Sequence, residues 1–180
     1  QGVGLALSNA SRYQEIKRRL NEMTLIQSLA QKFNQRLDVQ VVLDEVVNQL
    51  AMILGYPLVE IYLVEGEVMR LRAYFGEVPL TPDLSVTRGV VGKVIRTGKA
   101  ILIPDVTTEP EYMADISSTV SELAVPIFRN DQVCGVINIE TDCFWQLGEQ
   151  DCNLLEVLAG QISIALENAL LYERVREHAQ

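Results

Sequence analysis

Residues 121–140 read SELAVPIFRNDQVCGVINIE, and this stretch decides the fold class. It holds two strongly apolar runs, residues 123–128 and 133–140, on either side of a short charged turn. Apolar runs of strand length joined by a polar turn are typical of a β-hairpin. An antiparallel sheet is therefore expected in the domain.

Further strands and a short helix are expected before this hairpin. Residues 58–64 and 68–75 are β-branched or alternating runs separated by a Glu-Gly-Glu turn, which predicts a second hairpin. Residues 89–98, GVVGKVIRTG, predict a short helix that ends at a glycine. Residues 100–103 predict one more strand.

Long helices are expected towards both ends of the chain. Residues 8–35 contain no Gly or Pro and carry their apolar side chains on a helical stripe, and residues 38–54 form an amphipathic run with Asp38 as N-cap. Residues 149–177 have unbroken heptad spacing, which is typical of a coiled-coil seam. The element order predicts an α+β fold with an antiparallel sheet covered by helices.

Composition excludes several classes of function. The 15 Lys and Arg residues against 24 Asp and Glu residues give a net charge of −9, which repels nucleic acid. The longest apolar runs are far shorter than the roughly 20 residues that cross a membrane. Three scattered cysteines without a CxxC pair indicate a reducing, cytoplasmic location. The single histidine, His178, leaves little material for a metal site.

The two ends of the chain resemble one another. Residues 6–13, ALSNASRY, match residues 165–172, ALENALLY, at five of eight positions (A, L, N, A and Y). This similarity suggests that the chain opens inside the last helix of a preceding, similar domain. The alternative is that two apolar helices with heptad spacing share letters by chance.

Four sequence blocks, in this order, resemble the GAF domain family. The blocks are RGVVGKVIRTGK at 88–99 with IPDV at 103–106, SELAVPI at 121–127, GVINIE at 135–140, and Asp151 followed by the apolar positions of residues 154–169. The resemblance covers about residues 24–170. It implies a PAS-like fold with a central antiparallel sheet of five or six strands, long N- and C-terminal helices on one face, and a small-molecule pocket on the other.

The resemblance also implies a domain organisation and partners. We expect residues 1–16 to end the last helix of a preceding GAF-like domain, 17–37 to connect, 38–170 to form the GAF domain, and 171–180 to lead to a downstream effector such as a histidine kinase. GAF domains often form homodimers through their flanking helices. The residues expected at that dimer seam are Asn9, Tyr13, Ile16, Leu20, Leu158, Ala165, Asn168 and Tyr172.

Each specialised branch of the family binds its ligand or cofactor through signature residues, and these can be looked for in this sequence. Bilin-binding members use a Cys-His pair, which is absent, and haem-binding members need an axial His inside the pocket. The signature of cyclic-nucleotide binders is incomplete here, because Asn130 is followed by Asp131 rather than Lys. Members that resemble free methionine sulfoxide reductase carry a reactive Cys just before the Ser-Glu block, and residues 113–120 contain none. No cofactor and no metal are expected.

Five residues are the candidates for ligand binding: Tyr74, Asp105, Tyr112, Ser121 and Glu122. The resemblance places Glu122 at the pocket rim, whereas a solvent-facing strand residue is an equal alternative. Asp105 can instead cap the following turn. Tyr112 lies in the polar stretch 104–119, which is long enough to form a lid, and it can close over a ligand or cover the edge of the core.

These observations lead to a functional hypothesis. We expect a sensory GAF module that is not itself an enzyme, that belongs to a multidomain signalling protein such as a two-component sensor, and that relays the binding of a small molecule through its flanking helices. The alternative is a ligand-free GAF domain that serves dimerisation and spacing. Reduction of free methionine sulfoxide is the less favoured third hypothesis.

Overall fold

The computed structural model describes residues 2–35, 38–77, 82–113, 118–143 and 147–178, apart from the side chains of residues 2–3, 5, 30, 32–35 and 172–178. The helices are α1 (Gly2–Gln35), α2 (Val39–Leu54), α3 (Gly89–Thr97), the 3-10 turn η1 (Val106–Thr108) and α4 (Glu149–His178). The strands are β1 (Leu58–Glu65), β2 (Val68–Phe75), β3 (Asp83–Ser85), β4 (Ile101–Ile103), β5 (Ser121–Arg129) and β6 (Gln132–Thr141).

The strands form one antiparallel six-stranded sheet in the order β3-β2-β1-β6-β5-β4, which confirms the predicted α+β fold class. The expected hairpin of β5 and β6 turns at Asn130 and Asp131, whose φ angles of 50° and 60° suit a tight two-residue turn. Strand β3 was not among the strands expected from the sequence. Three residues paired at the edge with β2 are too few for a periodic pattern.

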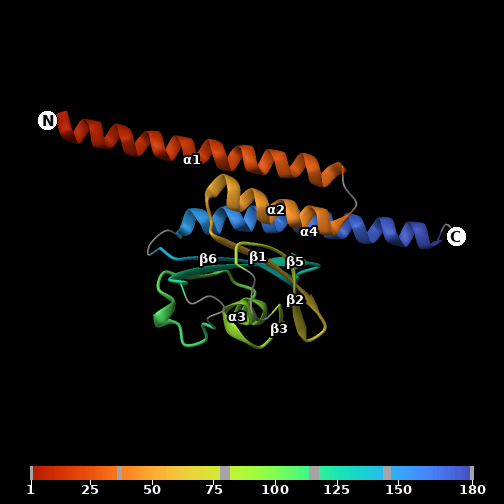
Figure 1. Ribbon diagram of the computed structural model, residues 1–180. Helices are drawn as coiled ribbons and strands as arrows, with labels where there is room; N and C mark the ends of the chain where they lie inside the picture. Colours follow the sequence, from red (N-terminus) through yellow and green to blue (C-terminus); the bar gives the residue numbers. More distant parts are fainter. Residues whose placement is uncertain (1, 36–37, 78–81, 114–117, 144–146, 179–180) are drawn as a thin grey trace.

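The molecule is layered (Figure 1). Helices α2 and α4 cover one face of the sheet and α1 lies over them, whereas α3 lies against the other face. The N-terminal half of α1 and the C-terminal end of α4 project past the sheet at opposite ends of the view. Both faces of the sheet are therefore covered, each by different elements.

The helix-covered face carries the main hydrophobic core. The odd-numbered residues of the three central strands point towards α2 and α4, because side chains alternate along a strand. They are Val59, Ile61, Leu123, Val125, Ile127, Ile137 and Ile139. Leu155, Leu158 and Ile162 of α4 pack against them with no exposed surface. Leu25 and Leu29 of α1 are also fully buried, so the second half of α1 packs on its own domain.

A buried carboxylate joins α1 to this core. Asp151, in the first turn of α4, accepts hydrogen bonds from the backbone N–H of Gly148 at 2.8 Å, from Arg18 Nη2 at 2.7 Å and from the hydroxyl of Tyr56. Burial and the neighbouring anion raise the pKa of Tyr56, so its hydroxyl stays a donor. The Asp151 side chain thus connects α1, the segment after α2 and the start of α4.

Close approach of two strands makes glycine necessary at position 135. A Cβ atom there would lie 2.6 Å from the carbonyl oxygen of Tyr62. We expect Gly135→Ala to lower the free energy of unfolding by about 2–3 kcal/mol through overpacking. Urea denaturation measures this change. Gly160→Ala is the matched control: nothing lies within 4 Å of the new Cβ, and the helix should gain about 1 kcal/mol. Equal stability of the two variants would contradict the prediction.

Candidate functional site

Four polar side chains gather on the α3 face of the sheet. Glu60 of β1, Glu122 of β5, and Asn138 and Glu140 of β6 occupy the even-numbered positions that alternate with the apolar core residues. The strand register places Glu60 directly opposite Asn138, and Glu122 directly opposite Glu140. Alternation and register together bring these residues to one place, which we call the carboxylate cluster.

The carboxylate cluster is deeply buried. Its four residues are between 2% and 5% exposed. Asn138 Nδ2 donates to Glu60 Oε2 at 3.0 Å and to Glu140 Oε1 at 3.4 Å, and the Thr119 hydroxyl donates to Glu140. Asn138 Oδ1 is buried and accepts no hydrogen bond within the described part of the chain. The cluster thus concentrates hydrogen-bond acceptors in a place with little access to water.

Helix α3 and the segment after it close the carboxylate cluster from outside. A cavity of about 20 Å³, room for roughly one water molecule, lies between the cluster and α3. Val90, Val91 and Met113 line its apolar side. Gly89, with a φ of +69°, begins α3 in a left-handed conformation that favours glycine, and Met113 lies next to it.

Ion pairs attach the segment around residues 109–111 to α3. Lys93 Nζ lies 3.1 Å from Glu109 Oε1, and Arg96 Nη2 lies 2.6 Å from Glu111 Oε2. The hydrogen bond between Lys93 and Glu109 raises the pKa of the lysine and lowers the pKa of the glutamate. These contacts are at the surface, so the segment can lift from α3 at modest energetic cost.

The five expected ligand residues lie in different surroundings. Glu122 lines the cavity, and Tyr112 is half-buried and packs with the apolar residues under α3. Asp105 accepts from the backbone N–H and the hydroxyl of Thr107, which is the capping role given as its alternative. Ser121 bonds to the Thr141 hydroxyl at 2.6 Å and ties two strand ends together. Tyr74 is 43% exposed and lines none of the cavities found among the described residues.

Sequence reasoning missed Glu60, Asn138 and Glu140. The available signal was a polar residue in the middle of an apolar strand run, as in LVEIY at 58–62 and VINIE at 136–140. Such a residue either faces solvent or lies in a buried polar site. Without knowing that α3 covers this face, the two cases look alike.

The expected dimer residues divide into two groups. Tyr13, Ile16 and Leu20 are 58% to 66% exposed, and Asn9 and Asn168 are exposed as well. Leu158 and Ala165 differ from the expectation, since they are 0% and 6% exposed and pack into the domain's own core. The large apolar side chains that α4 exposes are instead Val157, Ile164, Leu170 and Leu171. The side chain of Tyr172 lies outside the described residues.

The three cysteines lie away from the cavity lining. Burial raises the pKa of Cys134 and of Cys152, and the hydrogen bond to Asp142 raises the pKa of Cys143. All three thiols therefore stay protonated at neutral pH. Within the described ranges, no group of three or more His, Cys, Asp or Glu side chains is placed to hold a metal ion.

One helix has the length and composition of a membrane span. Residues 149–171 of α4 meet both criteria, although no other described helix does. The apolar side chains of this stretch include Leu154, Leu155, Leu158 and Ile162, which pack on the sheet. The apolar composition of α4 therefore reflects its place in the core of the domain.

The carboxylate cluster depends on the amide of Asn138. We expect Asn138→Asp to lower the free energy of unfolding by about 3 kcal/mol, because it removes two donated hydrogen bonds and adds a carboxylate to a buried site. Urea denaturation at neutral pH measures the loss. Asn153→Asp, an identical change at an exposed position of α4, should alter stability by less than about 0.5 kcal/mol. A small, equal effect of both changes would show that the cluster is not electrostatically crowded.

The chain is similar in sequence to proteins of different activity. It is 29% identical over 81 residues to GAF domain-containing protein A of Dictyostelium discoideum, a match over 45% of this chain and 51% of that protein. It is 26% identical over 105 residues to free methionine-R-sulfoxide reductase of Escherichia coli, a match over 58% of this chain and 63% of that protein. The chain thus matches little more than half the length of these relatives.

A solved structure shares the fold. The free methionine-R-sulfoxide reductase of Neisseria meningitidis, in complex with its substrate, superposes with a TM-score of 0.80 at 22% identity, over 84% of this chain and 91% of that one. Enzymes are therefore among the similar proteins in sequence and in structure. This finding contradicts the prediction that the chain is not an enzyme, because the GAF fold itself is compatible with catalysis.

The family is shown directly by its sequence profile. The GAF domain profile matches residues 36–167, which begins just before α2 and ends within α4. This range contains all six strands and the carboxylate cluster. The chain belongs to the GAF domain family.

Proposed function

We propose that this GAF domain binds a small molecule carrying a protonated amine in the carboxylate cluster, and that α1 and α4 relay the binding. The observation that supports this proposal is the burial of Glu60, Glu122, Glu140 and Asn138 on one face of the sheet. Three glutamates in a site with little access to water favour an amine, which brings its own hydrogen-bond donors. Arg88, just before α3, also lines this cavity.

An ammonium group fits the chemistry of the carboxylate cluster. It supplies three N–H donors and a positive charge, and the Oδ1 atom of Asn138 can accept from it. The apolar side chains of Val90, Val91 and Met113 suit the aliphatic part of the same ligand. An α-amino acid or an oxidised derivative combines these features. Free methionine sulfoxide is the first probe, because similar proteins act on it.

Entry of such a ligand requires movement of the covering segment. The cavity of about 20 Å³ is smaller than an amino acid, so Met113 must shift outward. Strands β5 and β6 carry the cluster on one face and contact α4 with the other. A ligand that favours one position of these strands would thereby favour one packing of α4.

Calorimetric titration tests the ligand class. We expect free methionine-(R)-sulfoxide to bind, and its analogue without the amino group to bind at least about tenfold more weakly, because the charge-assisted hydrogen bonds are lost. Glu122→Gln should weaken binding of the amino acid by about the same factor. Glu67→Gln, in the exposed turn between β1 and β2, is the matched control. Equal binding with and without the amine would refute an ammonium site.

Reduction of free methionine sulfoxide is a second candidate function, favoured by the named activity of similar proteins. The net reaction converts the sulfoxide and two thiols into the thioether, a disulfide and water. The nucleophile would have to be Cys134, Cys143 or Cys152, because the chain has no other cysteine. Turnover with dithiothreitol that disappears in the triple Cys→Ser variant would assign the activity. Binding without turnover would leave the relay as the function.

Dimerisation through the flanking helices remains part of this proposal. Tyr13, Ile16 and Leu20 form an exposed apolar stripe on α1, which a second copy can cover. We expect sedimentation analysis to report a dimer at micromolar concentration that Ile16→Glu converts to monomer. Ser11→Glu is the control, since at 100° per residue Ser11 lies about 140° round the helix from Ile16. A monomeric chain, or equal effects of both changes, would rule out this stripe as the interface.

A further inference from the structure

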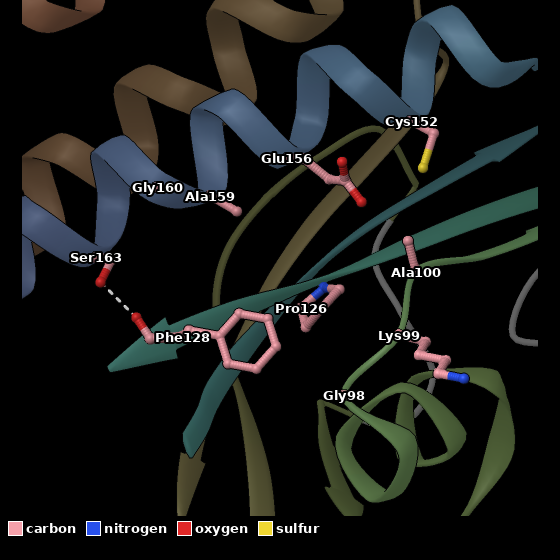
Figure 2. Close-up of a pocket in the computed structure, with 10 residues that line it drawn as sticks. All are labelled: Gly98, Lys99, Ala100, Pro126, Phe128, Cys152, Glu156, Ala159, Gly160 and Ser163. Atoms are coloured by element: carbon pink, nitrogen blue, oxygen red, sulfur yellow. Dashed lines mark hydrogen bonds between the residues drawn. The ribbon is translucent and has the colours of Figure 1, made fainter. Parts of the chain in front are cut away.

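A large groove lies on the helix side of the domain, at the edge of the sheet. It has a volume of about 630 Å³, which is within the range of small-molecule sites. It runs between α4 on one side and β5 with residues 98–100, which join α3 to β4, on the other. Figure 2 shows Glu156 reaching from α4 into this space, with Pro126, Ala100 and the Phe128 ring on the other side. The groove shares no lining residue with the cavity of the carboxylate cluster.

Two features of the chain keep the groove open. Strand β4 pairs with β5 only up to Ala124, so the rest of the β5 edge has no neighbouring strand. On the helix, small residues face this edge: Ala159, Gly160 and Ser163. Elsewhere α4 fills its contact with the sheet using leucine and isoleucine side chains.

Gly160 is an independent indication of function. Glycine weakens a helix interior relative to alanine, and nothing lies within 4 Å of the position that its Cβ would take. No contact inside the chain therefore requires glycine at this position. Its effect is to leave space in the wall of the groove.

The lining determines the chemistry of the occupant. Ala100, Pro126 and Ala159 offer apolar surface, and the Phe128 ring is 41% exposed. Glu156 makes no ion pair or hydrogen bond with any other described residue. The chain as a whole carries a net charge of −9. A protonated amine beside Glu156 would gain a charge-assisted hydrogen bond, and the Phe128 face attracts cations as well.

We infer that this groove is a second binding site, which takes a small amphipathic amine with an aromatic or aliphatic body. Lys99 at the rim does not change this assignment, because in Figure 2 its side chain lies on the α3 side of the groove, away from α4. The inference does not rest on the proposed function of the carboxylate cluster, since the two sites share no lining residue.

Amide NMR spectra with two matched probes test the inference. We expect 2-phenylethylamine to shift the amide signals of Gly98 and Gly160 saturably, and 3-phenylpropionate, of similar size but opposite charge, to leave them unchanged. Glu156→Gln should weaken amine binding by about tenfold, as expected for a lost hydrogen bond to a charged group.

Variants that fill the groove with a larger side chain at position 160 provide a second test. Gly160→Leu should abolish the shifts while the domain keeps or gains thermal stability, because leucine is a good helix former and the site has room for it. Gly160→Ala should weaken binding less. The inference is overturned if the carboxylate probe binds equally well, if Gly160→Leu leaves binding intact, or if the shifts appear at Gly89 and Glu122 instead. It is also overturned if the Gly160 variants change only the oligomeric state.

Discussion

The register of β1, β6 and β5 is the constraint on which the other features of the domain depend. Pairing Glu60 with Asn138, and Glu122 with Glu140, sends the intervening isoleucines, leucines and valines to the helices. A slip of any one of these strands by one residue would exchange its two faces and would place its glutamate in the core. Close contact at Gly135 and the tight turn at Asn130 and Asp131 both oppose such a slip.

The elements that cover the two faces of the sheet differ in how much apolar surface they bury. On one face α2 and α4 bury large apolar side chains, and Asp151 fastens α1 to them through Arg18 and Tyr56. On the other face α3 and the segment after it contribute a smaller apolar cluster, with exposed ion pairs such as Lys93 with Glu109. Burial of apolar area dominates stability, so the α3 side is the side that can open.

Most of the fold could be predicted from the sequence, because helices and strands depend on patterns among neighbouring residues. The hairpin turns, the Gly55 and Gly98 helix ends and the strand alternation each depend on a few neighbouring residues. The carboxylate cluster could not be predicted in the same way. Its members come from three strands and meet only through register, so Glu122 was found through a motif while Glu60 was missed. The burial of Leu158 and Ala165 was missed for a related reason: heptad spacing does not say which stripe of α4 faces the sheet.

Two departures from local consistency lie at the proposed sites. Three carboxylates on buried strand positions lower stability relative to apolar residues of similar volume, by roughly 1–4 kcal/mol for buried ionic groups. Gly160 lowers it by about 1 kcal/mol more in the middle of a helix. Sequences usually violate local rules where function requires it, and both violations here line a cavity or groove. Strand β5 contributes to both, with Glu122 at the cavity and Pro126 and Phe128 at the groove, so if both proposed sites bind ligands, a shift of β5 is the physical route by which they can be coupled.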